Sequence, residues 1–174
     1  MDQQTTRNTP FRQAVLALGS NLGDPLIHLQ NACAAIKHLP GVRFLKESNI
    51  YRTSPVGFSA QRDFLNAAVL IETTRSHETL LGMCLGIESA FGRQRSVPNG
   101  PRTLDLDLIA MEHTVCSSAD LILPHPRFRE RAFVCYPLKD LFPDEYCFGI
   151  PFGPLCFPED QQVWKTGFSL SKNS

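Results

Sequence analysis

The order in which strand-like and helix-like patterns follow one another is the feature that most constrains the fold. Short apolar runs are typical of buried strands, and apolar residues that recur every three or four positions are typical of amphipathic helices. The predicted elements, in order, are a strand at 14–18, a helix at 25–39, strands at 42–53 and 64–71, a helix at 76–91 and a strand at 103–111. This βαββαβ order is that of ferredoxin-like folds. We therefore expect an α+β protein with an antiparallel sheet, helices on one face and C-terminal additions.

Each of the two predicted helices has a recognisable beginning. Asp24 precedes Pro25, and this pair suits a helix start because a carboxylate accepts hydrogen bonds from the first turn and proline fits the first position. Ser76 precedes the second helix in the same way. Right-handed crossovers place both helices on one face of the sheet, which leaves the other face for a ligand or for further elements. A third, basic helix is expected at 127–141.

Composition narrows the class of protein. Lys plus Arg is 17 and Asp plus Glu is 17, and 43% of the 174 residues are hydrophobic, which excludes a broadly basic nucleic-acid coat and a charged, disordered polymer. We expect a polar leader at 1–13, one domain at 14–143 and a tail at 144–174. No apolar run approaches the roughly 20 residues of a membrane helix. The six cysteines form no Cys-x-x-Cys pair, which favours reduced packing thiols and a cytoplasmic location.

Two acidic residues on the last predicted strand are candidate metal ligands. Asp105 and Asp107 are separated by one residue, so their side chains leave the same face of the strand, with backbones roughly 6–7 Å apart. Two like charges held this close repel each other, and a bound cation relieves the repulsion. Mg²⁺ suits such a pair because it takes oxygen ligands and keeps positions for water and phosphate. The alternative is a solvated strand face.

Arginines surround this acidic pair in the sequence. Arg93, Arg95 and Arg102 flank a loop that leads directly to Asp105, and arginines beside metal-binding carboxylates are typical of polyphosphate sites. His125 lies between two prolines, and Arg127 and Arg131 would share one face of the expected third helix. The alternatives are that the loop is a surface loop whose arginines have no common function, that His125 is structural, and that Arg127 and Arg131 lie on a solvent-exposed helix face.

A polar side chain interrupts the most apolar predicted strand. Residues 64–71 are apolar except for Asn66, and a buried amide requires hydrogen-bond partners. One interpretation is that Asn66 bonds only to neighbouring backbone. The other is that it reads the polar edge of a ligand, because an amide carries both a donor and an acceptor.

The motifs together resemble those of the 6-hydroxymethyl-7,8-dihydropterin pyrophosphokinase family. The resemblance covers residues 14–143 and rests on five segments in order: ALGSNLG at 17–23, YRT at 51–53, DFLNAA at 63–68, GPRTLDLD at 100–107 and PHP at 124–126. The fourth segment is the most specific. The chain departs from the commoner bacterial pattern at Leu85, Asn99, Asp120 and Ile122, and at Phe64, where tyrosine is frequent. The resemblance therefore assigns no residue to the adenine ring.

The resemblance implies a folate-pathway enzyme that transfers the diphosphate of ATP to the hydroxymethyl oxygen of the reduced pterin and releases AMP. It implies that Asp105 and Asp107 hold two Mg²⁺ ions and that Arg93 and Arg102 are catalytic. The implied ATP site comprises Glu88, Arg95, Leu108, His125 and Arg131. The implied pterin site comprises Thr53, Ser54, Val56, Phe64, Asn66 and Phe133, with the amide of Asn66 reading the ring edge. Association or fusion with other folate-pathway enzymes occurs in some relatives.

Two other functions fit parts of the pattern. A two-metal phosphoesterase would also need Asp105, Asp107 and nearby cations, but it would cleave phosphodiesters without a pterin. A ferredoxin-like RNA-binding module would share the topology, although no aromatic ribonucleoprotein signature lies on a candidate central strand. The pyrophosphokinase hypothesis predicts ATP and the pterin as partners, with neither nucleic acid nor membrane.

Overall fold

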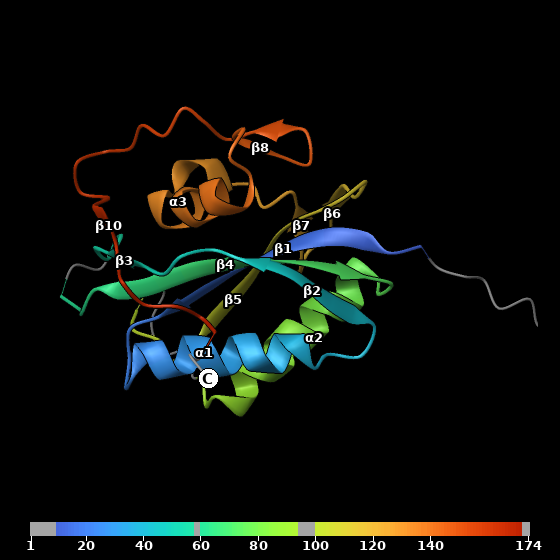
Figure 1. Ribbon diagram of the computed structural model, residues 1–174, viewed down its shortest axis with the longest axis horizontal. Helices are drawn as coiled ribbons and strands as arrows, with labels where there is room; N and C mark the ends of the chain where they lie inside the picture. The colour runs from blue at the N-terminus through green and yellow to red at the C-terminus, as the bar shows by residue number, and fades with distance from the viewer. Residues whose placement is uncertain (1–9, 58–59, 94–99, 172–174) are drawn as a thin grey trace, which may run out of the picture.

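The computed structural model describes residues 10–57, 60–93 and 100–171, and an antiparallel sheet forms its centre (Figure 1). Strand β1 (Arg12–Ser20) pairs with β4 (Phe64–Thr73) on one side and with β5 (Asp105–Met111) on the other. Beyond β4 lie β2 (Val42–Glu47) and β3 (Tyr51–Thr53), and β10 (Val163–Lys165) pairs with β3 at the edge. Every one of these pairings is antiparallel, as the sequence predicts.

Helices α1 (Pro25–Lys37) and α2 (His77–Ala90) cover one face of the sheet, as predicted (Figure 1). The Asp24 carboxylate accepts a hydrogen bond from the backbone of Ile27 at 3.1 Å, and the Ser76 hydroxyl caps α2 in the same way. Apolar side chains of both helices meet those of β1, β4 and β5 in one core. The core includes Leu16, Leu18, Leu29, Ile36, Ile71, Leu80, Leu106 and Leu108.

Helix α3 (Ala132–Leu141) and the first part of the tail cover the opposite face, whereas the end of the tail passes the edge of the sheet to α1, where Leu170 joins the first core (Figure 1). The second core joins side chains of the sheet to those of α3, among them Val15, Ala68, Ile109, Val134 and Leu138. Four phenylalanines of the tail region, Phe142, Phe148, Phe152 and Phe157, pack on it, together with the hairpin of β8 (Tyr146–Cys147) and β9 (Ile150–Pro151). The tail is therefore built into the fold.

The predicted single helix at 127–141 is wrong in its first part. A short 3-10 helix, η1 (Phe128–Glu130), precedes α3, and Arg131 between them is extended, with φ −111° and ψ 106°. Arg127 and Arg131 consequently do not share a helix face. Nothing in the periodicity of the sequence signals this break.

The predicted strand at 42–53 is divided into β2 and β3. Ser48 interrupts it because its backbone N–H donates to Ala68 at 2.9 Å while its hydroxyl accepts from the Ala68 N–H at 2.8 Å. The next residue, Asn49, donates from both its backbone and its side chain to the Asp140 carboxylate, each at 2.9 Å. These bonds connect the segment between β2 and β3 to helix α3.

The remaining described strands form a small hairpin. Strand β6 (Cys116–Ser117) pairs with β7 (Ile122–Leu123) beside the end of β5. All six cysteines are free thiols; four of them are buried, as the prediction of packing thiols requires, whereas Cys116 is half-buried and Cys156 is exposed. In the parts of the chain that the structure describes, no helix has both the length and the apolar character needed to cross a membrane.

Candidate active site

A cavity of about 640 Å³ lies on the α3 side of the sheet. Strand alternation explains its acidic floor, because Leu106 and Leu108 turn into the helix-side core while Asp105 and Asp107 turn into the cavity. The sequence-predicted residues that line it are Thr53, Ser54, Val56, Phe64, Asn66, Arg93, Arg102, Asp105, Asp107, His125, Arg131 and Phe133. Segments far apart in the sequence therefore converge on one site.

Two predicted site residues do not line the cavity, and a third lies outside the described residues. Glu88 is buried on α2, where its carboxylate accepts a hydrogen bond from the backbone of Leu106 at 2.7 Å and pairs with Arg93. Burial raises the pKa of Glu88 above its usual value. The side chain of Leu108 is buried in the core beneath α1 and α2. Arg95 lies outside the described residues.

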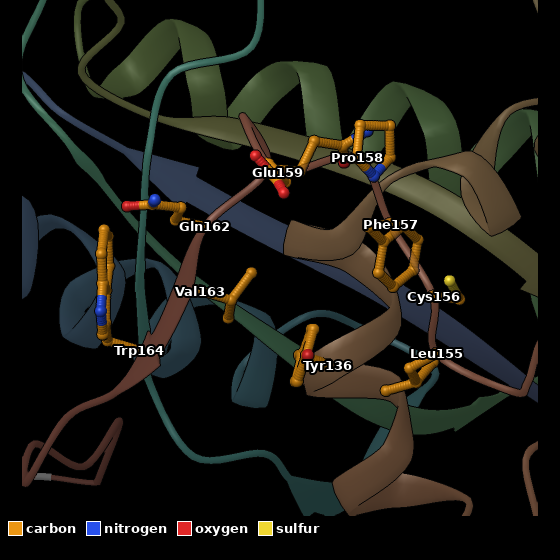
Figure 2. Close-up of a pocket in the computed structure, with 10 residues that line it drawn as sticks. Tyr136, Leu155, Cys156, Phe157, Pro158, Glu159, Gln162, Val163 and Trp164 are labelled. Atoms are coloured by element: carbon orange, nitrogen blue, oxygen red, sulfur yellow. The ribbon is translucent and has the colours of Figure 1, made fainter.

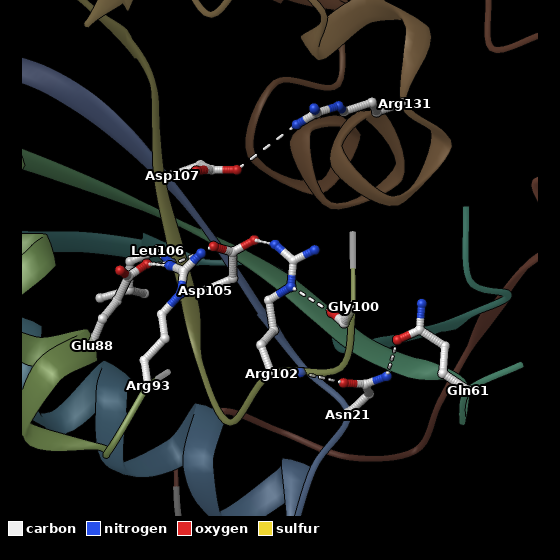
Figure 3. A network of polar contacts seen from close by, with 10 residues as sticks. All are labelled: Asn21, Gln61, Glu88, Arg93, Gly100, Arg102, Asp105, Leu106, Asp107 and Arg131. Atoms are coloured by element: carbon white, nitrogen blue, oxygen red, sulfur yellow. Dashed lines mark hydrogen bonds and ion pairs between the residues drawn. The ribbon is translucent and has the colours of Figure 1, made fainter. Parts of the chain in front are cut away.

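The carboxylate of Asp105 is held between two arginines (Figure 3). Arg93 Nη1 lies 2.7 Å from Asp105 Oδ1, and Arg102 Nη1 lies 2.5 Å from Asp105 Oδ2. Because Arg93 also contacts Glu88, α2 and β5 are joined through one guanidinium. The cations that the sequence places near the acidic pair thus touch it directly.

Asp107 has a different environment from that of Asp105. It forms an ion pair with Arg131 at the start of α3, whose Nη1 lies 3.8 Å from Asp107 Oδ2 (Figure 3). Burial, together with the negative charge of Asp105, raises the pKa of Asp107 from 3.8 to about 6. The pair therefore carries charge repulsion that the arginines compensate only in part.

His125 closes one side of the cavity on a fixed turn. Its backbone N–H donates to Ile109 at 2.7 Å, and its Nδ1 accepts a hydrogen bond from the backbone of Arg127 at 3.2 Å. Burial, followed by the positive charge of Arg131, lowers the pKa of His125. A neutral imidazole with Nδ1 already bonded leaves Nε2 to carry the proton.

The buried amide of Asn66 also lines the cavity. Its Nδ2 donates to Thr53 Oγ1 at 2.8 Å, so it has a side-chain partner in addition to its place in the cavity lining. Gly19 on β1 lies directly across from it, and a Cβ at Gly19 would be 2.8 Å from Asn66 Oδ1. In the sequence, Gly19 appears only as part of the segment ALGSNLG, and its role as space for the amide was missed.

Asn21 is a second residue whose role the sequence reasoning missed. Its Oδ1 accepts from the backbone of Arg102 at 2.9 Å, and its Nδ2 donates to Gln61 Oε1 at 3.0 Å and to the Arg62 carbonyl at 3.1 Å (Figure 3). It is 1% exposed. Asn21 thus ties the segment that carries Arg102 to the segment that precedes β4, and its place in the Gly-Ser-Asn motif was the available signal.

Comparison with known proteins agrees with this geometry. The model of the 7,8-dihydro-6-hydroxymethylpterin-pyrophosphokinase (HPPK) family matches residues 15–143. The chain belongs to this family. The resemblance inferred from the sequence motifs is confirmed, and with it the assignment of the chain as an HPPK, a pyrophosphokinase of folate biosynthesis. Membership favours this function over the phosphoesterase and the RNA-binding module.

Individual relatives agree with the HPPK assignment. The chain is 46% identical to the 2-amino-4-hydroxy-6-hydroxymethyldihydropteridine pyrophosphokinase of Methylorubrum extorquens over 132 residues, which are 76% of this chain and 84% of that one. It is 43% identical to the enzyme of the same name from Bacillus subtilis, over 74% of this chain and 77% of that one. It is also 39% identical to the folic acid synthesis protein fol1 of Schizosaccharomyces pombe, over 79% of this chain but 19% of that one.

Solved structures agree on the fold. A crystal structure of Plasmodium falciparum HPPK-DHPS superimposes with a TM-score of 0.62 at 12% identity, over 83% of this chain and 44% of that one. An HPPK-DHPS in complex with substrates gives a TM-score of 0.58 at 14% identity, over 78% and 41%. The chain thus spans about two fifths of these longer proteins, and these structures show a mixed α/β fold of the HPPK type.

Proposed function

We propose that the cavity binds ATP and 6-hydroxymethyl-7,8-dihydropterin side by side and transfers the diphosphate of ATP to the hydroxymethyl oxygen, with release of AMP. The observation that carries this proposal is the pair of carboxylates, Asp105 and Asp107, in one cavity with Arg93, Arg102 and Arg131 around them. Carboxylates bind divalent cations and guanidinium groups bind phosphate oxygens. A cavity in which the two kinds of group alternate therefore suits a polyphosphate that binds together with divalent cations.

The donor set fits Mg²⁺. Among the described residues, no three His, Cys, Asp or Glu side chains come together as a metal site, so the protein offers a pair of carboxylates rather than a cage. Mg²⁺ is bound in this way, by one or two carboxylates together with phosphate oxygens and water. We infer that Asp105 and Asp107 hold two Mg²⁺ ions with ATP. Bound Mg²⁺ would polarise the phosphate oxygens and offset their charge.

The arginines have two successive partners in this proposal. In the structure, Arg93 and Arg102 are paired with Asp105. With ATP bound, the same guanidinium groups would bind the diphosphate and the departing AMP, where charge develops during transfer, and Asp105 and Asp107 would hold the metal. Glu88 keeps Arg93 at the cavity through their ion pair. Arg131 and His125 complete the ATP side, and roles for Arg95 and for the backbone of Leu108 remain part of the same proposal.

The pterin occupies the end of the cavity nearest β3 and β4. Phe64 and Phe133 provide aromatic surfaces for a flat ring, and each lies 5.7 Å from an arginine, Arg102 and Arg131 respectively. Asn66, Thr53, Ser54 and Val56 line the same end. The Asn66 amide pairs with the donor and acceptor edge of the pterin, which gives selectivity because an analogue without that edge leaves a buried amide unpaired.

The chemistry needs alignment rather than a covalent intermediate. The hydroxymethyl oxygen of the pterin attacks the β-phosphorus of ATP in line with the bond to AMP, and the two binding ends of the cavity hold the reactants for that attack. The arginines stabilise the charge that develops.

We also propose that the order β3-β4-β1-β5, with α1 and α2 on one face, is the ferredoxin-like arrangement, since it joins two βαβ halves through an antiparallel sheet. The cytoplasmic location stays a prediction.

The test is a product analysis. Purified protein is incubated with ATP, Mg²⁺ and the hydroxymethyl dihydropterin, and AMP is expected to form in step with pterin consumption. ADP or inorganic phosphate as the nucleotide-derived product would contradict the proposal. Hydrolysis of phosphodiesters in the absence of the pterin would favour the two-metal phosphoesterase instead.

A further inference from the structure

The tail reaches the active-site cavity although it lies beyond the family match. The HPPK family match ends at residue 143, yet Gln161 lines the cavity that holds Asp105 and Asp107. Gln161 is half-buried and lies just before β10, the edge strand of the sheet. The sequence motifs assign no role to this residue.

The beginning of α3 lacks a cap of its own. Arg131 occupies the N-cap position and makes no capping hydrogen bond, because a guanidinium has donors and no acceptor. The first backbone N–H groups of a helix need acceptors from elsewhere. Gln161 Oε1 supplies one, since it accepts from the Ala132 N–H at 2.8 Å.

The same amide also holds the chain on the other side of Arg131. Gln161 Nε2 donates to the carbonyl of Glu130 at 3.0 Å. One side chain therefore fixes the two residues that flank Arg131, whose guanidinium is 3.8 Å from Asp107. Phe133, which also lines the cavity, follows Ala132 directly.

The tail is held firmly at its other contacts. The Gln162 N–H donates to Ser54 Oγ at 2.9 Å, and the Ser54 N–H donates to the Gln162 carbonyl at 3.1 Å. Ser54 Oγ donates in turn to the Asp160 carbonyl at 2.6 Å. Figure 2 shows the tail strand with Val163 and Trp164 passing beside Tyr136 of α3. Gln161 thus projects from a segment that is fixed to β3 on one side and to α3 on the other.

We propose that Gln161 is a positioning residue for the diphosphate transfer. It holds the backbone at 130–132 so that Arg131 reaches the acidic pair and Phe133 keeps its place at the pterin end. The proposal rests on the proposed function, because the groups that it positions are those assigned to ATP and the pterin. It gives the tail, which lies outside the family match, a part in substrate binding.

The test compares Gln161→Met with Gln162→Met. Methionine keeps the length of the side chain and removes both hydrogen bonds at 161, whereas Gln162 is exposed and is bonded to Ser54 through its backbone. Two readouts are used: steady-state AMP formation, and equilibrium binding of a nonhydrolysable ATP analogue. Trp164, the only tryptophan of the chain, reports by its fluorescence whether β10 is still seated, because its ring lies 4.8 Å from the Arg52 guanidinium.

For Gln161→Met we expect kcat/KM to fall about tenfold and analogue binding to weaken, which matches the loss of two hydrogen bonds. Trp164 emission should stay that of the wild type. Gln161→Glu should recover part of the loss, since a carboxylate still accepts from the Ala132 N–H. Gln162→Met should behave as wild type in every measurement.

Two results would overturn the proposal. One is Gln161→Met with wild-type kinetics and analogue binding. The other is a loss that comes with altered Trp164 emission, because the whole strand β10 and not the amide would then hold the site. A wild-type protein that makes no AMP would contradict the proposed function separately, and the analogue-binding comparison would still test Gln161.

Discussion

Arg102 donates to the carboxylate of Asp105 at 2.5 Å, so a proposed catalytic cation and a proposed metal ligand are in direct contact. The pairing keeps both groups in the cavity and compensates their charges. Under the proposed function, ATP with its cations would exchange this ion pair for two new ones, guanidinium to phosphate and carboxylate to metal.

Removal of the Arg102 guanidinium should slow the chemistry more than it weakens binding. We expect Arg102→Ala to lower kcat about 100-fold or more, because the charge that develops on the transferred group loses a fixed counter-charge. The matched control is Arg129→Ala, since Arg129 is exposed and does not line the cavity. Single-turnover AMP formation measures the step directly, and an unchanged rate would rule out a catalytic role for Arg102.

Asp107→Asn should abolish efficient use of Mg²⁺ without harming the fold. We expect the rate of AMP formation to fall about 100-fold and its Mg²⁺ dependence to shift to higher concentration, because an amide is a poor ligand for this ion. Asp144→Asn, on the surface of the tail, is the control and should keep wild-type activity.

The raised pKa of Asp107 also predicts how Asp107→Asn affects the unfolding temperature. Burial and the charge of Asp105 raise the pKa of Asp107 from 3.8 to about 6, so its ionisation disfavours the folded state as the pH rises through that interval. In metal-free buffer at pH 7, Asp107→Asn should therefore unfold at the same temperature as the wild type or at a higher one. A clearly lower Tm would show that the carboxylate is needed for folding.

The close approach of Gly19 to Asn66 predicts a selective loss of pterin binding. A methyl group at position 19 would lie 2.8 Å from Asn66 Oδ1, so Gly19→Ala must displace the amide. We expect the KM for the pterin to rise about tenfold or more, with little change in the KM for ATP.

Gly86→Ala is the control for that substitution. Gly86 is on an exposed turn of α2, and a Cβ added there would meet no atom within 4 Å, so alanine should stabilise the helix by about 0.5–1 kcal/mol. Equal effects of the two substitutions on the KM for the pterin would contradict the proposed place of Asn66.

The exposed cysteine of the tail should react faster with an alkylating reagent than the cysteines in the two cores. Cys156 is exposed, whereas burial raises the pKa of Cys84 and of Cys135 to about 12. Since the thiolate is the reactive form, Cys156 should be modified first by iodoacetamide at mildly alkaline pH. Peptide mass mapping after brief labelling checks this, and early labelling of Cys84 or Cys135 would contradict the packing of the cores.

The sequence predicted what local patterns determine. Asp24 and Ser76 begin their helices where expected, and the spacing of Asp105 and Asp107 placed both in one cavity. It did not predict the break at Ser48, whose hydroxyl bonds to Ala68 on another strand, or the extended Arg131 before α3. The role of Gln161 could not be predicted for the same reason. Its partners are backbone groups about 30 residues away, which only the folded chain brings close to it.

The most direct test of the central claim is the mass of the pterin product together with the identity of the nucleotide product. Transfer of an intact diphosphate predicts a pterin that has gained two phosphoryl groups and one AMP for each pterin converted. A pterin with a single added phosphoryl group and ADP as the nucleotide product would contradict the account.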